Sequence, residues 1–383
     1  MRRVSIIVPV YYGEKYIQSL IHQAEECRKC IKDRLEIELI LVNDAPDDPL
    51  DEQYQSEWID IAVLNTDVNQ GVQSARIRGI EYCKGSYILL LDQDDKIAPE
   101  YLKSQMESIG DCDAVVCRVI HEEKPFYNLT RPFKEIICKE YMFQEGDSII
   151  SPGQVLMRKE AVSDIWKTNI LKNNGADDWM LWLCMINEGK SFALNDEILF
   201  EHVVDGNNAS LRTLDMHRSE LEVLEIIRKS QMFSEEDIRI LEETVRNIEE
   251  KRLFLMGKFQ RISFVYDAWV SLRNCGIHIS KYLRQRGYRS IAVYGVTSLG
   301  KRLYEELAMD KFEVSYFIDI NAPFLYEQIP VYSPEEELRQ VDAVVISLVQ
   351  DEQQITDMLQ MKLSADIWKM AELMKKIKES VNA

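Results

Sequence analysis

Tyr87-Ile88-Leu89-Leu90-Leu91 continues directly into Asp92-Gln93-Asp94-Asp95, and this stretch decides the fold. The five apolar residues predict a buried strand, and its abrupt end places the carboxylates at the carboxyl edge of a sheet. Open α/β sheets bind their ligands at that edge. Three acids within four residues repel one another unless a cation neutralises them, and oxygen ligands suit Mg²⁺ or Mn²⁺. A solvated acidic turn is the alternative interpretation.

Strand and helix patterns alternate through the first hundred residues. Apolar strands are expected at 4–10, 37–42 and 61–64, and helices at about 14–33 and 72–83. This β-α-β-α-β order predicts a parallel sheet with helices on both faces. The pattern is mixed as far as about residue 211, with strands expected at 114–120, 154–157 and 197–202 and a helix at 178–187. No linker rich in glycine or proline interrupts this region, so residues 1–212 are expected to form one α/β domain.

The rest of the chain is expected to form a helical connector, 213–287, and a second small α/β domain, 288–383. Ser234-Glu235-Glu236-Asp237 resembles a capping box. An apolar stripe follows it at three- and four-residue spacing: Ile238, Leu241, Val245, Ile248, Leu255 and Phe259. The stripe favours a helical hairpin within the chain, and a homo-oligomer through the helices of 213–287 is the alternative. The second domain is expected to have strands at 290–294, 313–318 and 342–348, a helix at 301–308, a short helix after Ser333-Pro334, and helix from 353 onward.

Composition excludes several classes of function. The formal charge of −19 argues against a general electrostatic grip on nucleic acid or on an anionic membrane. No apolar segment approaches the roughly 20 residues of a membrane helix, so no transmembrane segment is expected. The apolar stretch after Arg3 ends too soon for a signal peptide. We therefore expect a cytoplasmic protein, with a peripheral position at the inner face of the membrane as a second option, and reduced cysteines.

The N-terminal residues resemble the family 2 glycosyltransferases, which are inverting enzymes of the GT-A fold that use nucleotide-diphosphate sugars. The resemblance covers roughly residues 3–212 and rests on five motifs in the expected order. These are the opening strand and loop at 4–14, Leu41-Val42-Asn43-Asp44-Ala45, Asn69-Gln70-Gly71 with Ala75-Arg76 and Gly79, Asp92-Gln93-Asp94-Asp95, and Gly175-Ala176-Asp177-Asp178-Trp179. Each motif alone is a weak signal, whereas five in order indicate the family strongly.

The resemblance implies a set of residues for the nucleotide sugar. They are Pro9, Tyr11, Glu14, Asp44, Gly71, Arg76, Asp92 and Gln93. Asp44, at the end of a strand, can accept the imide N–H of uracil, although it can also simply begin a turn. Arg76 is a candidate for phosphate binding, and an exposed helical arginine is the alternative interpretation.

The resemblance also implies metal ligands, a base and an acceptor side. Asp92, Asp94, Asp95 and His202 are expected at the metal; Asp95 coordinates it or orients its neighbours, and Asp205 is the alternative to His202. Asp178 is expected to be the general base, with Asp177 as second choice, because single displacement needs a carboxylate opposite the leaving group. Acids that merely stabilise a helix N-terminus are the alternative for both. Gly153, Gln154 and Trp179 are candidates for the acceptor side. The alternatives are a plain turn for Gly153 and Gln154 and a core position for Trp179.

The C-terminal domain is expected to be Rossmann-like. Gly295 and Gly300 match the first and last glycines of the dinucleotide fingerprint, but Thr297 occupies the middle position, where glycine lets the backbone approach a pyrophosphate. Asp319 lies where a ribose-binding acid would. We expect NAD(P) not to bind and the domain to serve in docking or acceptor positioning.

The sequence therefore predicts an inverting, metal-dependent transferase with a UDP-sugar donor and Mg²⁺ or Mn²⁺ as cofactor. By resemblance, its acceptor is a hydroxyl of a cell-surface glycan, a lipid-linked oligosaccharide or a teichoic-acid-like polymer. Two alternatives remain open. One is a catalytically silent GT-A module that only binds sugar nucleotides, and the other is an NAD(P)-linked enzyme centred on the C-terminal domain.

Overall fold

The computed structural model of this protein describes residues 2–31, 35–121, 124–125, 133–203 and 213–381. The chain divides into two compact units, Met1–Glu250 and Lys251–Ala383. One long helix, α8 (Glu235–Asn274), contributes residues to both units. The domain boundaries expected at 212/213 and 287/288 stay predictions.

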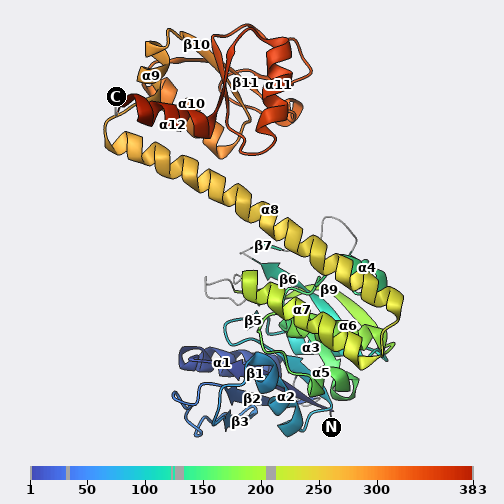
Figure 1. Cartoon of the computed structure of the whole chain (residues 1–383). Coiled ribbons are helices and arrows are strands. Elements are labelled where there is room, and N and C mark those ends of the chain that lie inside the picture. Colours follow the sequence, from blue (N-terminus) through green and yellow to red (C-terminus); the bar gives the residue numbers. More distant parts are fainter. Residues whose placement is uncertain (1, 32–34, 122–123, 126–132, 204–212, 382–383) are drawn as a thin grey trace. The chain divides into compact units, whose positions relative to one another are not determined.

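The N-terminal unit is built on one large mixed sheet (Figure 1). In the described residues its strand order is β3-β2-β1-β4-β8-β6-β9-β5, with β7 paired to β6. The strands are β1 (Arg2–Val10), β2 (Leu35–Asn43), β3 (Asp60–Asn65), β4 (Tyr87–Leu90), β5 (Lys96–Ile97), β6 (Ala114–His121), β7 (Lys124–Pro125), β8 (Val155–Arg158) and β9 (Phe192–His202). The first four strands in this order are parallel, as predicted, and β8 runs antiparallel to β4. The carboxyl ends of β1, β2 and β4 therefore meet at one edge.

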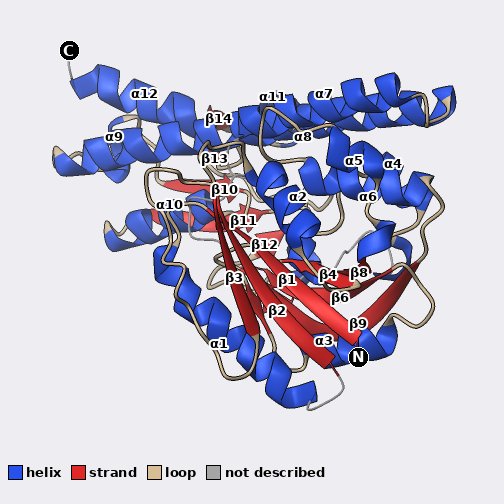
Figure 2. Cartoon of the chain, turned by 90° about the horizontal axis from the view of Figure 1, so that it is seen from below, coloured by secondary structure: helices blue, strands red, loops and turns tan. Residues whose placement is uncertain are grey.

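Helices cover both faces of this sheet (Figure 2). They are α1 (Glu14–Ile31), α2 (Val72–Tyr82), α3 (Tyr101–Ser108), α4 (Lys139–Gln144), α5 (Asp164–Thr168), α6 (Asp177–Asn187) and α7 (Thr213–Ser230). The alternation of side chains along β1 explains the two layers, since successive residues of a strand point to opposite faces. Ile6 packs in the cluster that contains α1 and α3, whereas Ile7 packs in the cluster that contains α2 and α6.

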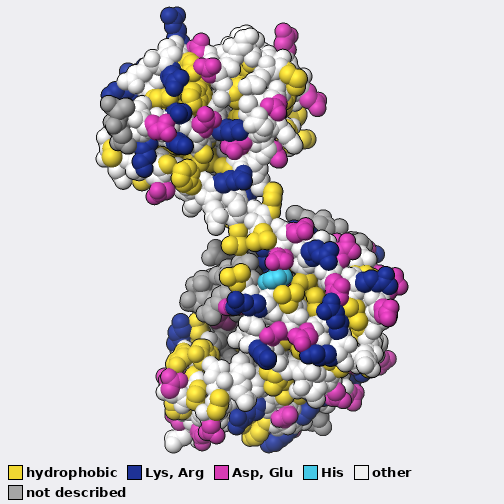
Figure 3. Space-filling view, in the orientation of Figure 1, with side chains coloured by type: hydrophobic (Ala, Val, Ile, Leu, Met, Phe, Trp, Pro, Cys, Tyr) yellow, Lys and Arg dark blue, Asp and Glu magenta, His cyan; other side chains and the backbone are white. Residues whose placement is uncertain are grey.

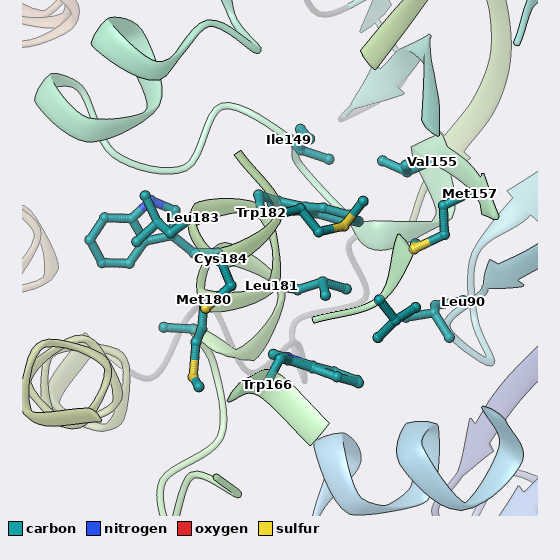
Figure 4. Packing of buried hydrophobic residues seen from close by; sticks show 14 of the residues in the cluster. Leu90, Ile149, Val155, Met157, Trp166, Met180, Leu181, Trp182, Leu183 and Cys184 are labelled. Carbon is teal, nitrogen blue, oxygen red and sulfur yellow. The ribbon is translucent and has the colours of Figure 1, made fainter. Parts of the chain in front are cut away.

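Helix α6 is the central helix of the second cluster (Figure 4). Every residue from Trp179 to Met185 is buried, so the helix is enclosed on all sides rather than amphipathic. Figure 4 shows Trp182, Leu181 and Cys184 among side chains from β4, β8 and α5. This packing fixes the start of α6, where Asp177 and Asp178 stand.

The C-terminal unit contains a second, wholly parallel sheet. Its strand order in the described residues is β12-β11-β10-β13-β14. The elements are α9 (Ile279–Gln285), β10 (Ser290–Tyr294), α10 (Ser298–Met309), β11 (Glu313–Ile318), β12 (Val331–Tyr332), β13 (Ala343–Ile346), α11 (Glu352–Lys362), β14 (Asp366–Lys369) and α12 (Met370–Val381). The expected α/β fold class, with a large sheet domain, helices and a second small parallel-sheet domain, is confirmed.

One local prediction for this unit is wrong. Residues 333–337 form a turn rather than a short helix, although the Ser333 backbone N–H donates to Glu336 Oε1 at 3.0 Å, as in a capping box. Three successive glutamates follow Pro334 and give a first helical turn no apolar face to pack. The tail from residue 353 is mainly helical, as predicted, and the short strand β14 lies between α11 and α12, because pairing with β13 determines a four-residue edge strand more than its own sequence does.

The stripe on α8 divides in two. Leu241 and Val245 are buried in the core of the N-terminal unit, whereas Leu255 and Phe259 are exposed. The predicted packing within the chain is thus confirmed only for the first half of the stripe. Among the described helices, none combines the length and the apolar character that a membrane crossing requires.

Two glycines inside helices give a matched stability test. A Cβ on Gly79 in α2 would lie 2.3 Å from Ile7 Cγ2 in the sheet, whereas a Cβ on Gly257 in α8 would meet nothing within 4 Å. We expect Gly79→Ala to lower the free energy of unfolding by about 1–2 kcal/mol through overpacking, and Gly257→Ala to raise it by about 0.5–1 kcal/mol. Calorimetric unfolding of the two variants measures both effects. A gain in stability for Gly79→Ala would contradict this packing of α2 on β1.

Candidate functional site

The candidate site lies where β1, β2 and β4 end together. The side chain of Gln93 pairs with the backbone of Tyr11: Tyr11 N–H donates to Gln93 Oε1 at 3.0 Å, and Gln93 Nε2 donates to Tyr11 O at 3.3 Å. The Gln93 amide lies so close to Gly13 that a Cβ there would be 2.0 Å from Oε1. Gln93 therefore joins the loop after β4 to the loop after β1.

Two tyrosines present their rings to solvent at this edge. Tyr11 and Tyr12 are both about half exposed, and their ring centroids lie 4.6 Å apart in an edge-to-face arrangement. The Tyr12 hydroxyl donates to the Asp47 carboxylate at 2.9 Å, and this bond raises the pKa of Tyr12 to about 12. Pro9 lies half-buried just before them, and Glu14 is exposed at the start of α1. The Tyr12–Asp47 pair was not predicted, since no local signal links residues 35 positions apart.

Asp44 is buried and holds the next loop. Its Oδ1 accepts from Gln70 N–H at 3.0 Å and its Oδ2 accepts from Gly71 N–H at 2.7 Å. Gly71 has a φ of +88° and begins α2, so Asp44 fixes the backbone that leads into that helix. Each carboxylate oxygen can accept a second hydrogen bond, so this loop-holding role leaves lone pairs for the predicted contact with a uracil.

Arg76 connects the two acidic groups of the site. Its Nη2 lies 2.6 Å from Asp92 Oδ1, and its Nη1 lies 2.6 Å from Asp177 Oδ2. The guanidinium is 4% exposed, and Nε is buried with no hydrogen-bond partner in the described chain. Arg76 is therefore neither an exposed helical arginine nor turned toward solvent where a phosphate would arrive. Although burial lowers its pKa, the charges of Asp177 and Asp92 outweigh that effect and raise it.

The two acids at the start of α6 have different surroundings. Asp177 is buried against Arg76, whereas Asp178 is half-buried and accepts the Trp179 N–H at 2.8 Å. Burial and the neighbouring Asp177 charge raise the pKa of Asp178 to about 7. A carboxylate with this pKa can accept a proton near neutral pH. The difference favours Asp178 over Asp177 as the base.

Asp147 is a further acid near this pair, and no sequence motif singles it out. Its Oδ1 accepts the Ile149 N–H at 2.9 Å, and its side chain is exposed. The charge of Asp178 acts on the Asp147 carboxyl group and favours its protonated form. It lies in the loop after α4, far from α6 in sequence, so only the fold brings the two charges within influence of each other.

Asp95, in the loop after β4, contacts His202 at the end of β9. The His202 Nδ1 lies 3.0 Å from Asp95 Oδ1, which also accepts the Val203 N–H at 3.0 Å, while Ser151 Oγ donates to Asp95 Oδ2 at 2.9 Å. Although burial lowers the pKa of His202, the hydrogen bond to Asp95 outweighs it and raises that pKa. Both oxygens of Asp95 are engaged by the protein, and this favours the orienting role over direct coordination. Asp205 lies outside the described residues.

The residues of this edge fit a divalent cation in part. A carboxylate that holds one nitrogen of a histidine ring is the usual outer partner of a metal-binding histidine, so His202 would bind through Nε2. Asp92 and Asp94 are half-buried carboxylates at the same edge. Asp92, Asp94, Asp95 and His202 do not form a group whose ligand atoms all lie within 4.8 Å of one another. The cation-binding role of Asp92, Asp94 and His202 stays a prediction, and the contacts of Asp95 favour its role in orienting His202.

The candidate acceptor residues lie in the interior instead. Trp179 is 3% exposed, and packing within the core leaves its ring no face for a sugar. Gly153 is buried against Phe200, and the side chain of Gln154 donates to Cys117 O at 2.9 Å within a buried polar network. The burial of these three residues favours a structural role over the predicted acceptor role. Ser151, beside them, reaches the site through Asp95.

In the loop at 295–300, which resembles the dinucleotide fingerprint, polar groups form hydrogen bonds with side chains of the same unit. Thr297 Oγ1 accepts the Gly300 N–H at 3.1 Å and lies 2.9 Å from Ser347 Oγ, while Asp319 Oδ2 accepts the Val296 N–H at 2.8 Å. A Cβ on Gly300 would lie 2.3 Å from Gly295 O, so the last glycine serves helix–strand packing. The groups that would face a pyrophosphate and a ribose thus bind one another.

A group of three potential metal ligands occurs in this unit. In the part of the chain that the structure describes, only His278, Glu306 and Asp310 bring such atoms within 4.8 Å of one another. His278 Nδ1 lies 2.9 Å from Asp310 Oδ2, Trp269 Nε1 donates to Glu306 Oε2 at 2.6 Å, and Arg273 Nη1 lies 3.6 Å from Glu306 Oε1. An arginine already supplies the positive charge, so the group is an ion-pair cluster that ties α8 to α9 and α10.

Residues 5–166 match the family model for glycosyl transferase family 2. The chain is 34% identical over 151 residues to EpsH of Bacillus subtilis, described as a glycosyltransferase, which covers 38% of this chain and 41% of that protein. It is 35% identical over 220 residues to the minor teichoic acid biosynthesis protein GgaB of the same organism, covering 54% of this chain and 23% of GgaB. The chain thus spans less than half the length of these relatives.

Among solved structures, that of S. aureus TarS, residues 1–349, aligns with part of this chain. It aligns with 64% of this chain and 71% of its own at 18% identity, with a TM-score of 0.48. A mannosyltransferase from Pyrobaculum calidifontis in complex with GDP-Man and Mn²⁺ aligns with 65% of this chain and 70% of its own at 14% identity, with a TM-score of 0.41. The family predicted from the sequence motifs is confirmed by the family match.

Removing Arg76 tests the link between the acids. Arg76→Met leaves Asp92 and Asp177 without their partner, and we expect a loss of about 3 kcal/mol in the free energy of unfolding. Arg78→Met, two residues along α2 at an exposed position, should change it by less than about 0.5 kcal/mol. In a double-mutant cycle measured by denaturant unfolding, Asp177→Asn should cost less in the Arg76→Met background than in the native chain. If the losses in the free energy of unfolding from the two substitutions were additive, Arg76 and Asp177 would not be energetically coupled.

Proposed function

We propose that this chain, whose residues 5–166 are a family 2 glycosyltransferase domain, is a metal-dependent inverting transferase. It moves a sugar from a UDP-sugar to a hydroxyl of a cell-surface glycan, a lipid-linked oligosaccharide or a teichoic-acid-like polymer. The observation that carries the proposal is the Arg76 bridge, which gathers Asp92 after β4 and the Asp177-Asp178 pair of α6 into one site. GgaB, named a minor teichoic acid biosynthesis protein, supports the acceptor class.

The donor binds at the edge formed by β1, β2 and β4. The exposed ring of Tyr11 offers a face for the base, and Asp44 accepts the imide N–H of uracil with a lone pair that Gln70 and Gly71 do not use. Gln93 holds the Tyr11 backbone in place during binding. The diphosphate then lies toward Asp92 and Asp94.

A divalent cation held by Asp92, Asp94 and His202 would supply the positive charge that offsets the charge on the leaving nucleotide. Asp95 keeps the His202 ring oriented through Nδ1. Arg76 forms ion pairs with both Asp92 and Asp177, so these acids are held together in the absence of the cation. The protein thereby maintains the binding edge before the donor arrives.

Asp178 is the base. The acceptor hydroxyl transfers its proton to the Asp178 carboxylate as its oxygen attacks the anomeric carbon opposite the departing nucleotide, which inverts that carbon. Burial of Asp178 and the charge of the neighbouring Asp177 raise the pKa of Asp178, and together they outweigh the opposite effect of Arg76. A base whose pKa matches the working pH has the greatest rate advantage.

A catalytically silent module and an NAD(P)-linked enzyme predict different results in a single screen. The full chain is incubated with nucleotide sugars, with and without Mn²⁺, and release of the nucleoside diphosphate is measured. Turnover of a UDP-sugar supports the proposal, and binding without turnover supports the silent module. A rise in the melting temperature with NAD(P), together with no effect of any nucleotide sugar, supports the NAD(P)-linked enzyme.

The pH dependence of turnover tests Asp178. Because its raised pKa keeps the carboxyl protonated below about 7, we expect kcat/KM to rise as the pH increases through about 7 and then to level off. Asp178→Asn should reduce kcat by about 10²–10⁴ and abolish the rise. Asp164→Asn, at an exposed acid of α5, is the control and should leave the profile unchanged. Full activity of Asp178→Asn would exclude it as the base.

Calorimetric titration tests the metal residues separately from turnover. We expect UDP to bind at least about tenfold more tightly in the presence of Mn²⁺, because the cation offsets the repulsion between diphosphate and carboxylates. Asp94→Asn should remove most of that gain, whereas the exposed Asp111→Asn should keep it. Equal affinity with and without Mn²⁺ would argue against a metal at this edge.

A further inference from the structure

The middle of α8 is basic, whereas the chain as a whole is acidic. The protein as a whole carries a formal charge of −19, yet residues 251–266 contain no aspartate or glutamate. The same interval contains four cations: Lys251, Arg252, Lys258 and Arg261. The net acidity of the chain therefore does not describe this surface, and a local attraction for anions is available here.

The same interval exposes large apolar side chains. Phe254 is 62% exposed and Phe259 is 65% exposed. The exposed large apolar side chains of the interval are Leu253, Phe254, Leu255, Met256, Phe259 and Phe264. Figure 3 shows hydrophobic side chains with basic side chains beside them on the exposed part of this helix. Single exposed apolar residues are ordinary, whereas a contiguous group indicates an interaction surface.

The two kinds of side chain occupy different sides of the helix. At 100° per residue, Leu255, Phe259, Met256, Leu253 and Phe264 fall within one half of the circumference. Lys258, Lys251 and Arg261 fall within the other half. Phe254, Ile262 and Arg252 depart from this division. A helix with an aromatic and aliphatic face and a basic face, free of acids, matches the pattern of helices that lie in a membrane interface.

The interval is already helical without a partner. Val265, Trp269 and Leu272 continue the same helix into the core of the C-terminal unit, and Leu241 and Val245 lie in the core of the N-terminal unit. Because packing at its two ends fixes the helix, binding carries no cost of folding the segment.

We propose that residues 251–264 of α8 dock the protein on an anionic phospholipid surface. The apolar half inserts among the acyl chains near the headgroups, and the cations on the other half and at its border attract the lipid phosphates. Charge complementarity favours this occupant over a second copy of the chain, since pairing two such intervals would bring two sets of cations together. The inference is independent of the proposed transferase activity, although it would hold the enzyme where lipid-linked acceptors are found.

Vesicle sedimentation of the full chain tests the proposal. Vesicles with about 30% phosphatidylglycerol in phosphatidylcholine should bind the protein, vesicles of phosphatidylcholine alone should bind it much less, and added salt should weaken the binding. Lys258→Gln should lower the partition coefficient about fivefold, and Leu255→Gln with Phe259→Gln should abolish most of the binding. The controls are Lys103→Gln and the pair Met309→Gln with Met361→Gln, all exposed positions elsewhere.

Two outcomes would overturn the proposal. One is that the native chain fails to bind the anionic vesicles, or that the α8 variants bind them as well as the controls do. The other is that light scattering finds a dimer which Leu255→Gln with Phe259→Gln converts to a monomer while vesicle binding is absent, and this would assign the surface to a second copy. Release of nucleoside diphosphate from the sugar donor should be equal in all variants, so failure here is distinguishable from failure of the transferase proposal.

Discussion

The two ion pairs of Arg76 are the interaction on which the site depends. A guanidinium buried to this degree is costly to desolvate unless carboxylates compensate it, and Asp92 and Asp177 do so at 2.6 Å each. These partners come from the loop after β4 and from the start of α6, which are 85 residues apart in sequence. A single side chain therefore links helix α2, the acidic strand end and the start of helix α6. At that start, burial and the neighbouring Asp177 raise the pKa of Asp178 to about 7.

Other charged and polar side chains of the site also hold its architecture. Asp44 fixes the backbone before α2, Gln93 ties the loop after β4 to Tyr11, and Asp95 binds His202, Val203 and Ser151. Each of them accepts hydrogen bonds from the backbone or from side chains of neighbouring loops. These contacts preorganise the edge before any ligand is present. A preorganised edge costs less reorganisation when a charged donor binds.

The sequence predicted the strands of the parallel half-sheet well, because β1, β2 and β4 are continuous apolar runs that end in turn or acidic residues. It also predicted which residues approach the edge, since the carboxyl ends of parallel strands meet there. It could not predict that Arg76 faces inward, that Tyr12 reaches Asp47 or that Asp147 senses Asp178, because these contacts depend on tertiary packing. Trp179 was misjudged for the same reason: α6 carries apolar residues all round, and only the packed sheet and helices show that no side of Trp179 is free. The turn at Ser333 shows the opposite failure, in which a local helix signal finds no surface to pack against.

The central claim is that the Arg76-linked acids form an edge that takes a cation together with a nucleoside diphosphate. Anomalous diffraction from crystals of the full chain grown with UDP and Mn²⁺ tests it most directly. The account predicts an anomalous peak at the edge beside Asp94 and His202, in contact with the diphosphate, with the Arg76–Asp177 pair intact. UDP bound without a peak there, or a peak only at the His278–Glu306–Asp310 cluster, would contradict it.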